Sequence, residues 1–261
     1  MLNQSARYFV PEPSHWPIIG SVALLSMASG AALWMNEASW GKFPLIVGLC
    51  LLFLMMFGWF GSVARESEGG QYNKQIDAGF RWGMSWFIFS EVMFFAAFFG
   101  ALFYMRVLSI PWLGDVEHKL LWPEFAAQWP SAGPGASEKF TPMAAWGIPA
   151  INTALLLSSG VTVTWAHWGL LQNSRRQLSL GLAATVLLGI AFLVLQAYEY
   201  HHAYTEMGLT LGAGAYGATF FMLTGFHGFH VTLGAIMLSV ILARSMQGHF
   251  TADRHLSLIH I

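Results

Sequence analysis

The chain alternates between long apolar runs and shorter polar segments. An apolar run of roughly 20 residues is long enough to cross a bilayer as an α-helix, and six stretches meet this length. The connection at 106–145 is the longest; it is rich in Pro, Gly, Trp and charge and too polar to span. We therefore predict an all-α, polytopic transmembrane helix bundle that forms one membrane domain over 1–261. The six spans are predicted at 17–35, 43–64, 80–105, 146–171, 178–203 and 214–243, followed by a tail at 244–261.

The composition is that of a membrane protein. Of the 261 residues, 56% are hydrophobic and 10% are charged, whereas soluble domains carry about 25% charged residues. A formal net charge of -1 argues against a nucleic-acid partner. The single cysteine, Cys50, cannot form an internal disulfide, and we interpret it as a small buried hydrophobe. Residues 1–16 lack the apolar core of a signal peptide.

Lysine and arginine are distributed unevenly between the two sides of the predicted bundle. With six crossings, both tails share a side with the second and fourth loops. Basic residues favour the cytoplasmic side, so we predict that both termini lie in the cytoplasm, or in the matrix if the membrane is mitochondrial. The richer side holds Arg7, Arg65, Lys74, Arg81, Arg175, Arg176, Arg244 and Arg254, and the poorer side holds Lys42, Arg106, Lys119 and Lys139.

Small residues at four-residue spacing mark where the predicted helices touch. Lipid supplies no hydrophobic drive between helices, so close backbone approach through small side chains provides the contact. We expect helices three to six to pack against one another, and helices one and two, which carry fewer polar groups, to stand more apart. The stripes are Gly79 and Gly83 on the third helix, Ser158, Thr162 and Ala166 on the fourth, and Gly181, Thr185 and Gly189 on the fifth.

One carboxylate, Glu91, lies near the middle of the third predicted span. A charge at that depth costs several kcal/mol, so an intramembrane acid is a functional-site hypothesis by default. Such an acid could load and release a proton near neutrality. Under the structural alternative it faces neighbouring helices and fixes their packing. Bulky side chains at helical spacing should form a collar around it: Phe87, Ile88, Phe94, Phe95 and Phe98.

Four more polar side chains, His167, Glu199, His227 and His230, lie in the later spans. One interpretation is a metal or haem site. The two histidines of the sixth helix stand three residues apart, a spacing that such sites use, and Glu199 or His167 could complete the ligand set. Glycines flank both histidines, however, and this favours close helix packing with imidazoles bonding across helices.

Two further interpretations concern the same segments. In an intramembrane serine protease, Ser158 or Ser159 would be the nucleophile and His227 the base. Such proteases share a Gly-x-Ser-Gly element, which is incomplete here because Leu157 stands where its first glycine belongs. In the other interpretation the chain is a helix-bundle subunit whose polar residues hold helices together, while a partner carries the redox chemistry. The physical chemistry of the residues favours this last interpretation without excluding the others.

Eight short motifs follow one another along nearly the whole chain. They are His15-Trp-Pro, Arg65-Glu-Ser, Ser90-Glu-Val-Met-Phe-Phe, Asn152-Thr, Ser159-Gly-Val-Thr-Val-Thr-Trp-Ala-His, Gln196-Ala-Tyr-Glu-Tyr, Tyr216-Gly-Ala-Thr-Phe-Phe and Thr224-Gly-Phe-His-Gly-Phe-His-Val. In this order they resemble subunit III of the haem–copper cytochrome c oxidases, and the last motif is the most specific.

The resemblance implies a subunit of a proton-translocating respiratory oxidase that holds no haem, copper or other metal and contributes no catalytic residue. Oxygen reduction would take place in subunit I, which would receive electrons from the dinuclear copper of subunit II. This chain would contact subunit I directly. The family's subunit III supports proton uptake in subunit I and protects it from turnover-linked inactivation. Helices one and two favour a cytochrome c oxidase over the shorter quinol-oxidase counterpart, which remains the alternative.

The resemblance also implies a set of site residues by position. Glu91 matches the family's intramembrane glutamate. Trp59, Glu66, Arg81 and Arg244 match positions near a V-shaped cleft between helices one and two and the remaining bundle. In the family this cleft holds structural phospholipids and offers a route for dioxygen. Arginine suits bidentate contact with phosphate, although both arginines also fit an ordinary positive-inside role.

Two departures from the family pattern stand out. Gln71, Tyr72 and Asn73 occupy a stretch where family members can place histidines near the lipid, so the headgroup preference stays open. The family also has a seventh helix, whereas this chain reads His255-Leu-Ser-Leu-Ile-His-Ile. We expect an incomplete copy, because losing that helix would expose polar faces of its neighbours to lipid. We predict an inner-membrane location, and the long connection at 106–145 favours a bacterial over a mitochondrial membrane.

Overall fold

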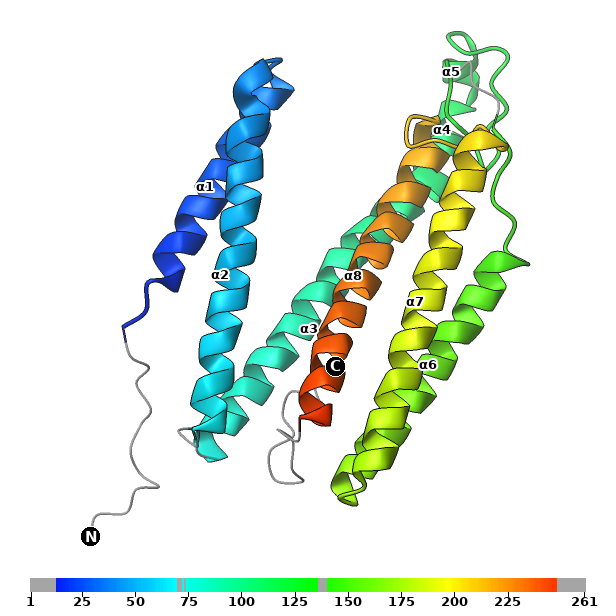
Figure 1. The fold of residues 1–261 in the computed structure, drawn as a ribbon. Helices are drawn as coiled ribbons and strands as arrows, with labels where there is room; N and C mark the ends of the chain where they lie inside the picture. The colour runs from blue at the N-terminus through cyan, green and yellow to red at the C-terminus, as the bar shows by residue number, and fades with distance from the viewer. Residues whose placement is uncertain (1–12, 70–71, 73, 136–139, 248–261) are drawn as a thin grey trace. The chain divides into compact units, whose positions relative to one another are not determined.

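The computed structural model describes residues 13–69, 72, 74–135 and 140–247, and every regular element within them is helical (Figure 1). Six helices are long and apolar enough to cross a membrane, which confirms the predicted polytopic helical bundle. Most of the predicted tail, from residue 248 on, lies outside the described residues, as do Gln71 and Asn73. The elements are α1 (Trp16–Met35), η2 (Ser39–Gly41), α2 (Lys42–Glu68), α3 (Lys74–Phe103), η3 (Tyr104–Ser109), α4 (Ile110–Leu113), α5 (Val116–Lys119), α6 (Ile148–Leu171), α7 (Arg175–Thr205) and α8 (Gly214–Met246).

Proline marks the start of two of these helices. Pro17 and Pro149 lie at the first or second position of α1 and α6. The first-turn N–H groups of a helix have no partner within it, so the missing N–H of proline costs little there. The observed starts of α1 and α6 therefore lie close to the predicted ones.

The third span extends further than predicted. After α3 the backbone continues through the π-helical turn η3 into α4, so the candidate membrane span covers Ala78–Leu113. The connection predicted at 106–145 thus begins with helical residues rather than with a loop. Single π-helical turns inside longer helices are rare and often lie at functional sites.

The chain divides into two compact units, 1–82 and 83–261. In the first unit α1 packs along α2 through glycines. A Cβ added at Gly30 would collide with the backbone of Leu45, and one added at Gly48 would lie 2.7 Å from the carbonyl oxygen of Ala23. Close approach of this kind drives helix pairing in a membrane. Cys50 lies exposed on α2, so the prediction of a buried thiol is wrong.

In the second unit α7 lies between α6 and α8 (Figure 1). Two predicted small-residue stripes meet here: a Cβ at Gly181 of α7 would lie 2.9 Å from Cα of Ala166 on α6. The hydroxyls of Thr162 and Thr185 share a hydrogen bond of 2.7 Å between the same helices. Packing of α6 on α7 through these stripes is confirmed. The apolar core beside them consists of Ala166, Leu170, Leu178, Leu182 and Ile241.

The glycine stripe predicted on the third helix behaves differently. A Cβ added at Gly79 or Gly83 would meet no atom of the described residues within 4 Å. The smooth surface that these two glycines make on α3 is therefore not used for packing within the described part of this chain.

The extramembrane connection is attached to the start of α8. The amides of Ala215 and Tyr216 donate to the carbonyls of Ala132 and Ser131 at 3.0 and 3.1 Å. The rings of Trp129 and Tyr216 meet edge to face. Gly214 has a φ of +70°, and a Cβ there would collide with the Ala132 carbonyl. Glycine is therefore required where the connection meets the helix.

Candidate functional site

The intramembrane carboxylate meets a histidine. Nε2 of His230 on α8 lies 2.6 Å from Oε2 of Glu91 on α3, and Nδ1 of the same ring lies 2.6 Å from the carbonyl oxygen of Phe226. Both side chains are about one-third exposed. Sequence analysis singled out both residues without pairing them, and the structure brings them together.

The geometry restricts where the protons of this pair can be. A backbone carbonyl only accepts, so Nδ1 of His230 donates its hydrogen to Phe226. Nε2 then either accepts from a protonated Glu91 or, in an imidazolium, donates to the Glu91 carboxylate. The two arrangements contain the same number of protons and a net charge of zero. The pair thus avoids the cost of an isolated charge within a span.

Aromatic rings surround the pair on one side. The ring centroids of Phe94 and Phe95 lie 6.1 and 5.2 Å from that of His230, and Phe98 contacts Phe94 at 5.0 Å. These three members of the predicted collar are confirmed. The other two, Phe87 and Ile88, are exposed on α3, so the collar is incomplete within this chain.

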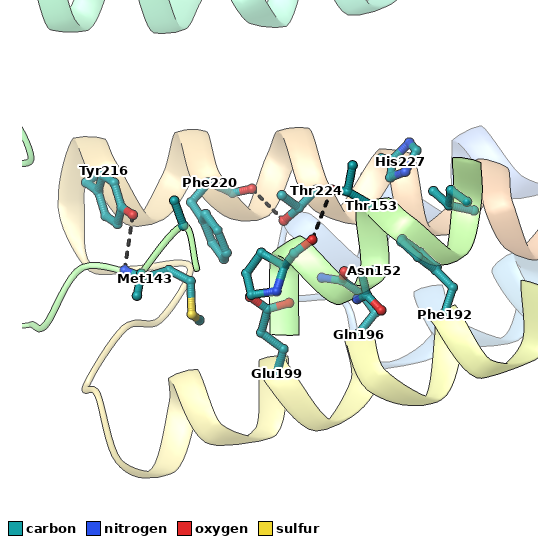
Figure 2. A pocket seen from close by; sticks show the side chains of 14 residues that line it. Met143, Asn152, Thr153, Phe192, Gln196, Glu199, Tyr216, Phe220, Thr224 and His227 are labelled. Carbon is teal, nitrogen blue, oxygen red and sulfur yellow. Dashed lines mark hydrogen bonds between the residues drawn. The ribbon is translucent and has the colours of Figure 1, made fainter. Parts of the chain in front are cut away.

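A second polar centre lies between α6, α7 and α8 (Figure 2). It is a cavity of about 300 Å³, and residues 143–145 are among those that line it. Glu199 extends into it from α7, and His227 lines it from α8. The amide of Met143 donates to the Tyr216 hydroxyl at 3.3 Å and joins this segment to α8 (Figure 2).

Two polar side chains in this cavity are almost completely buried. Glu199 is 5% exposed and Asn152 is 3% exposed. Neither amide atom of the Asn152 side chain has a hydrogen-bond partner among the described residues. A buried polar group without a partner costs about 1–3 kcal/mol. The cavity therefore offers donors and acceptors that the described chain leaves unused.

The two histidines of α8 contact different helices. His230 faces α3, whereas the ring of His227 meets Phe192 of α7 edge to face at 5.8 Å. His227 shares its cavity with Glu199, and His167 is not among the residues that line it. Within the described residues, no three His, Cys, Asp or Glu side chains gather closely enough to hold a metal ion.

The hydroxyls proposed for a serine protease are engaged within their own helix. Ser158 donates to the carbonyl of Ala154 and Ser159 to that of Leu156, each at 2.8 Å. No hydrogen bond joins either hydroxyl to His227 within the described part of the chain. Both hydroxyls are thus hydrogen-bonded to backbone carbonyls of α6.

The four candidate lipid residues lie on three helices. Trp59 is exposed on α2, Arg81 is exposed on α3 and Arg244 is half-buried near the end of α8. Glu66 accepts a hydrogen bond of 2.7 Å from the Tyr72 hydroxyl. Burial and this carboxylate together raise the pKa of Tyr72. Trp59, Glu66 and Arg81 belong to the first unit and Arg244 to the second, so the lipid cleft remains a prediction.

Sequence reasoning missed two members of the second centre. Asn152 and Gln196 entered only as parts of motifs, yet both side chains line the cavity (Figure 2). An amide inside an otherwise apolar span is itself a signal, because neighbouring helices or bound water must satisfy it. That signal was available for both residues.

Comparison with known proteins gives one consistent result. The family model described as "Cytochrome c oxidase subunit III" matches residues 6–260. The chain is 40% identical over 256 residues to the "Cytochrome c oxidase subunit 3" of Cyprinus carpio and to that of Danio rerio. The protein of the same name from Struthio camelus is 39% identical. Each alignment covers 98% of this chain and 89% of the relative.

Proposed function

Because the chain belongs to the cytochrome c oxidase subunit III family, we propose that it supports proton uptake in a partner subunit of the oxidase and prolongs the working life of the complex. Membership makes the chain a subunit of a respiratory oxidase and a multi-pass inner-membrane protein. The finer roles are our proposal. In it the chain contacts subunit I directly, with subunit II in the same complex.

The observation that carries this proposal is the 2.6 Å contact between Glu91 and His230. Shifting the proton across this contact changes the pair from neutral to ionic at constant net charge. The pair can also accept or release a proton when a donor or acceptor approaches, because both groups are partly exposed. A pair of this kind buffers protons within a span without holding a permanent uncompensated charge.

The chain works in this proposal without a metal of its own. Haem and copper belong to subunits I and II, and the histidines of this chain serve packing and proton exchange. A Soret band or stoichiometric copper in the isolated chain would contradict this part of the proposal.

Phospholipids complete the proposed role. Trp59, Glu66, Arg81 and Arg244 would hold them near a cleft that also admits dioxygen. The sequence favoured a bacterial membrane, but the relatives compared above are animal proteins, so that preference gains no support.

The test is the turnover lifetime of an oxidase that carries Glu91→Gln. Glutamine keeps the shape of glutamate, and its amide can donate to Nε2 of His230, but it cannot exchange a proton. We expect normal assembly and initial oxygen consumption, with faster loss of activity during sustained turnover. The matched control is Glu117→Gln, which removes a carboxylate from exposed α5 and should change neither quantity.

Two outcomes would contradict the proposal. If Glu91→Gln abolishes oxygen consumption at once, the acid takes part in the obligatory chemistry. If its lifetime under turnover equals that of the parent, the Glu91–His230 contact serves packing alone.

A further inference from the structure

Arg106 is an ionisable residue inside a candidate membrane span. The span covers Ala78–Leu113, and Arg106 lies in its π-helical turn η3. Trp112, exposed six residues later, is of the type that marks the membrane–water interface. Arg106 precedes Trp112 by six residues of continuous helix and so lies more than one helical turn deeper in the span. From this depth the long arginine side chain reaches toward the phosphate level.

Arg106 has no counter-ion within the described residues. It takes no part in the two ion pairs that join His202 to Glu206 and His230 to Glu91. Lys42, another cation predicted on the same side of the membrane, lies over the ring of Trp34 at 5.3 Å. A cation within a span normally pairs with a specific group, and the identity of that group indicates the role of the cation.

An apolar groove begins beside this cation. It has a volume of about 170 Å³, and its walls come from the end of the third span, the extramembrane connection and α8. Along α8 it runs from Tyr216 to Thr224, which is about 12 Å of helix. The principal lining side chains are Leu102, Arg106, Trp129, Tyr216, Phe220 and Leu223.

We propose that this groove binds one phospholipid, with its phosphate on the Arg106 guanidinium and an acyl chain along α8. The guanidinium fork matches phosphate oxygens bidentately, and apolar side chains line the path that leads from it into the span. The guanidinium thus suits the phosphate of a phospholipid, and the apolar groove suits its acyl chain. The proposed site uses none of the four lipid residues considered above.

The site is tested on the intact oxidase by native mass spectrometry of copurified phospholipids. Losing a charge-assisted contact weakens binding about tenfold or more, so Arg106→Gln should remove one phospholipid per complex. The control Lys119→Gln removes a cation from exposed α5 and should leave the lipid count unchanged. A phospholipid with a photoactivatable acyl chain should label residues 219–224 in the parent complex and not in Arg106→Gln.

Three outcomes would overturn the proposal. The lipid count could be unchanged in Arg106→Gln. The acyl probe could label residues 219–224 equally in both complexes. Finally, Arg106→Gln could detach the subunit while the parent shows no labelling, which would assign the guanidinium to a carboxylate of a neighbouring subunit.

Discussion

Replacing His230 by phenylalanine removes one side of the Glu91–His230 contact but keeps a ring among its aromatic neighbours. Phe94 and Phe95 lie within 6.1 and 5.2 Å of the His230 ring centroid, so a phenyl ring can occupy the same space. The loss is then chiefly that of the hydrogen bond, together with an unpaired Glu91. Glu91→Leu removes the other side, and the double variant removes both.

The free energy that couples the two residues depends on the state of the proton. Interhelical hydrogen bonds between neutral groups in a membrane protein average about 0.6 kcal/mol and reach about 1.7 kcal/mol. Breaking a buried ion pair by removing one partner costs about 3–5 kcal/mol. Each side chain keeps about a third of its surface exposed, which weakens the contact. We therefore expect a coupling energy of about 1–2 kcal/mol, near the range for a hydrogen bond between neutral groups.

The assay is denaturant-driven release of this subunit from the purified oxidase, measured for the parent, both single variants and the double variant. The coupling energy is the amount by which the two single losses together exceed the loss in the double variant. A coupling near zero would refute a stabilising bond between Glu91 and His230. A coupling above about 3 kcal/mol would refute the neutral arrangement and establish an ion pair.

Other variants test packing and the remaining alternatives. Gly181→Val drives a branched side chain into the backbone of α6 and should reduce assembly, as judged by subunit content, whereas Gly160→Ala has open space around it and should not. Ser159→Ala should assemble normally and change no cleavage of a transmembrane substrate, because this hydroxyl donates within its own helix; lost cleavage would revive the protease interpretation. Arg81→Ala with Arg244→Ala should lower copurified anionic lipid, measured by mass spectrometry, through lost phosphate contacts; unchanged content would leave both arginines a topological role.

The sequence was sufficient to predict six spans, apart from the end of the third, and one helix interface. A run of apolar residues has to be helical in lipid, because every backbone polar group must be satisfied internally. The approach of Gly181 to Ala166 could be predicted because small residues at fixed spacing lie on one face whatever else the helix contacts.

The partner of Glu91 could not be predicted in the same way. His227 and His230 stand three residues apart on α8 and point toward different helices. The rotation of α8 about its axis decides which histidine faces α3. That rotation follows from packing across the whole second unit and not from any local pattern. The extension of the third span to Leu113 was missed for a related reason. One arginine and one proline look like a span end, but Arg106 lies within the π-helical turn η3 and Pro111 within α4, which continues the helix.

The attachment of residues 129–132 to the first turn of α8 also has a consequence for biosynthesis. Chains are made from the N-terminus, so this connection emerges while its anchor at Gly214–Tyr216 is not yet synthesised. Its hydrogen bonds to Ala215 and Tyr216 can form only once the last described span has been inserted. Protection of this segment from protease on stalled nascent chains therefore reports when α8 enters the membrane, and nascent chains that end before residue 214 should leave it open to cleavage.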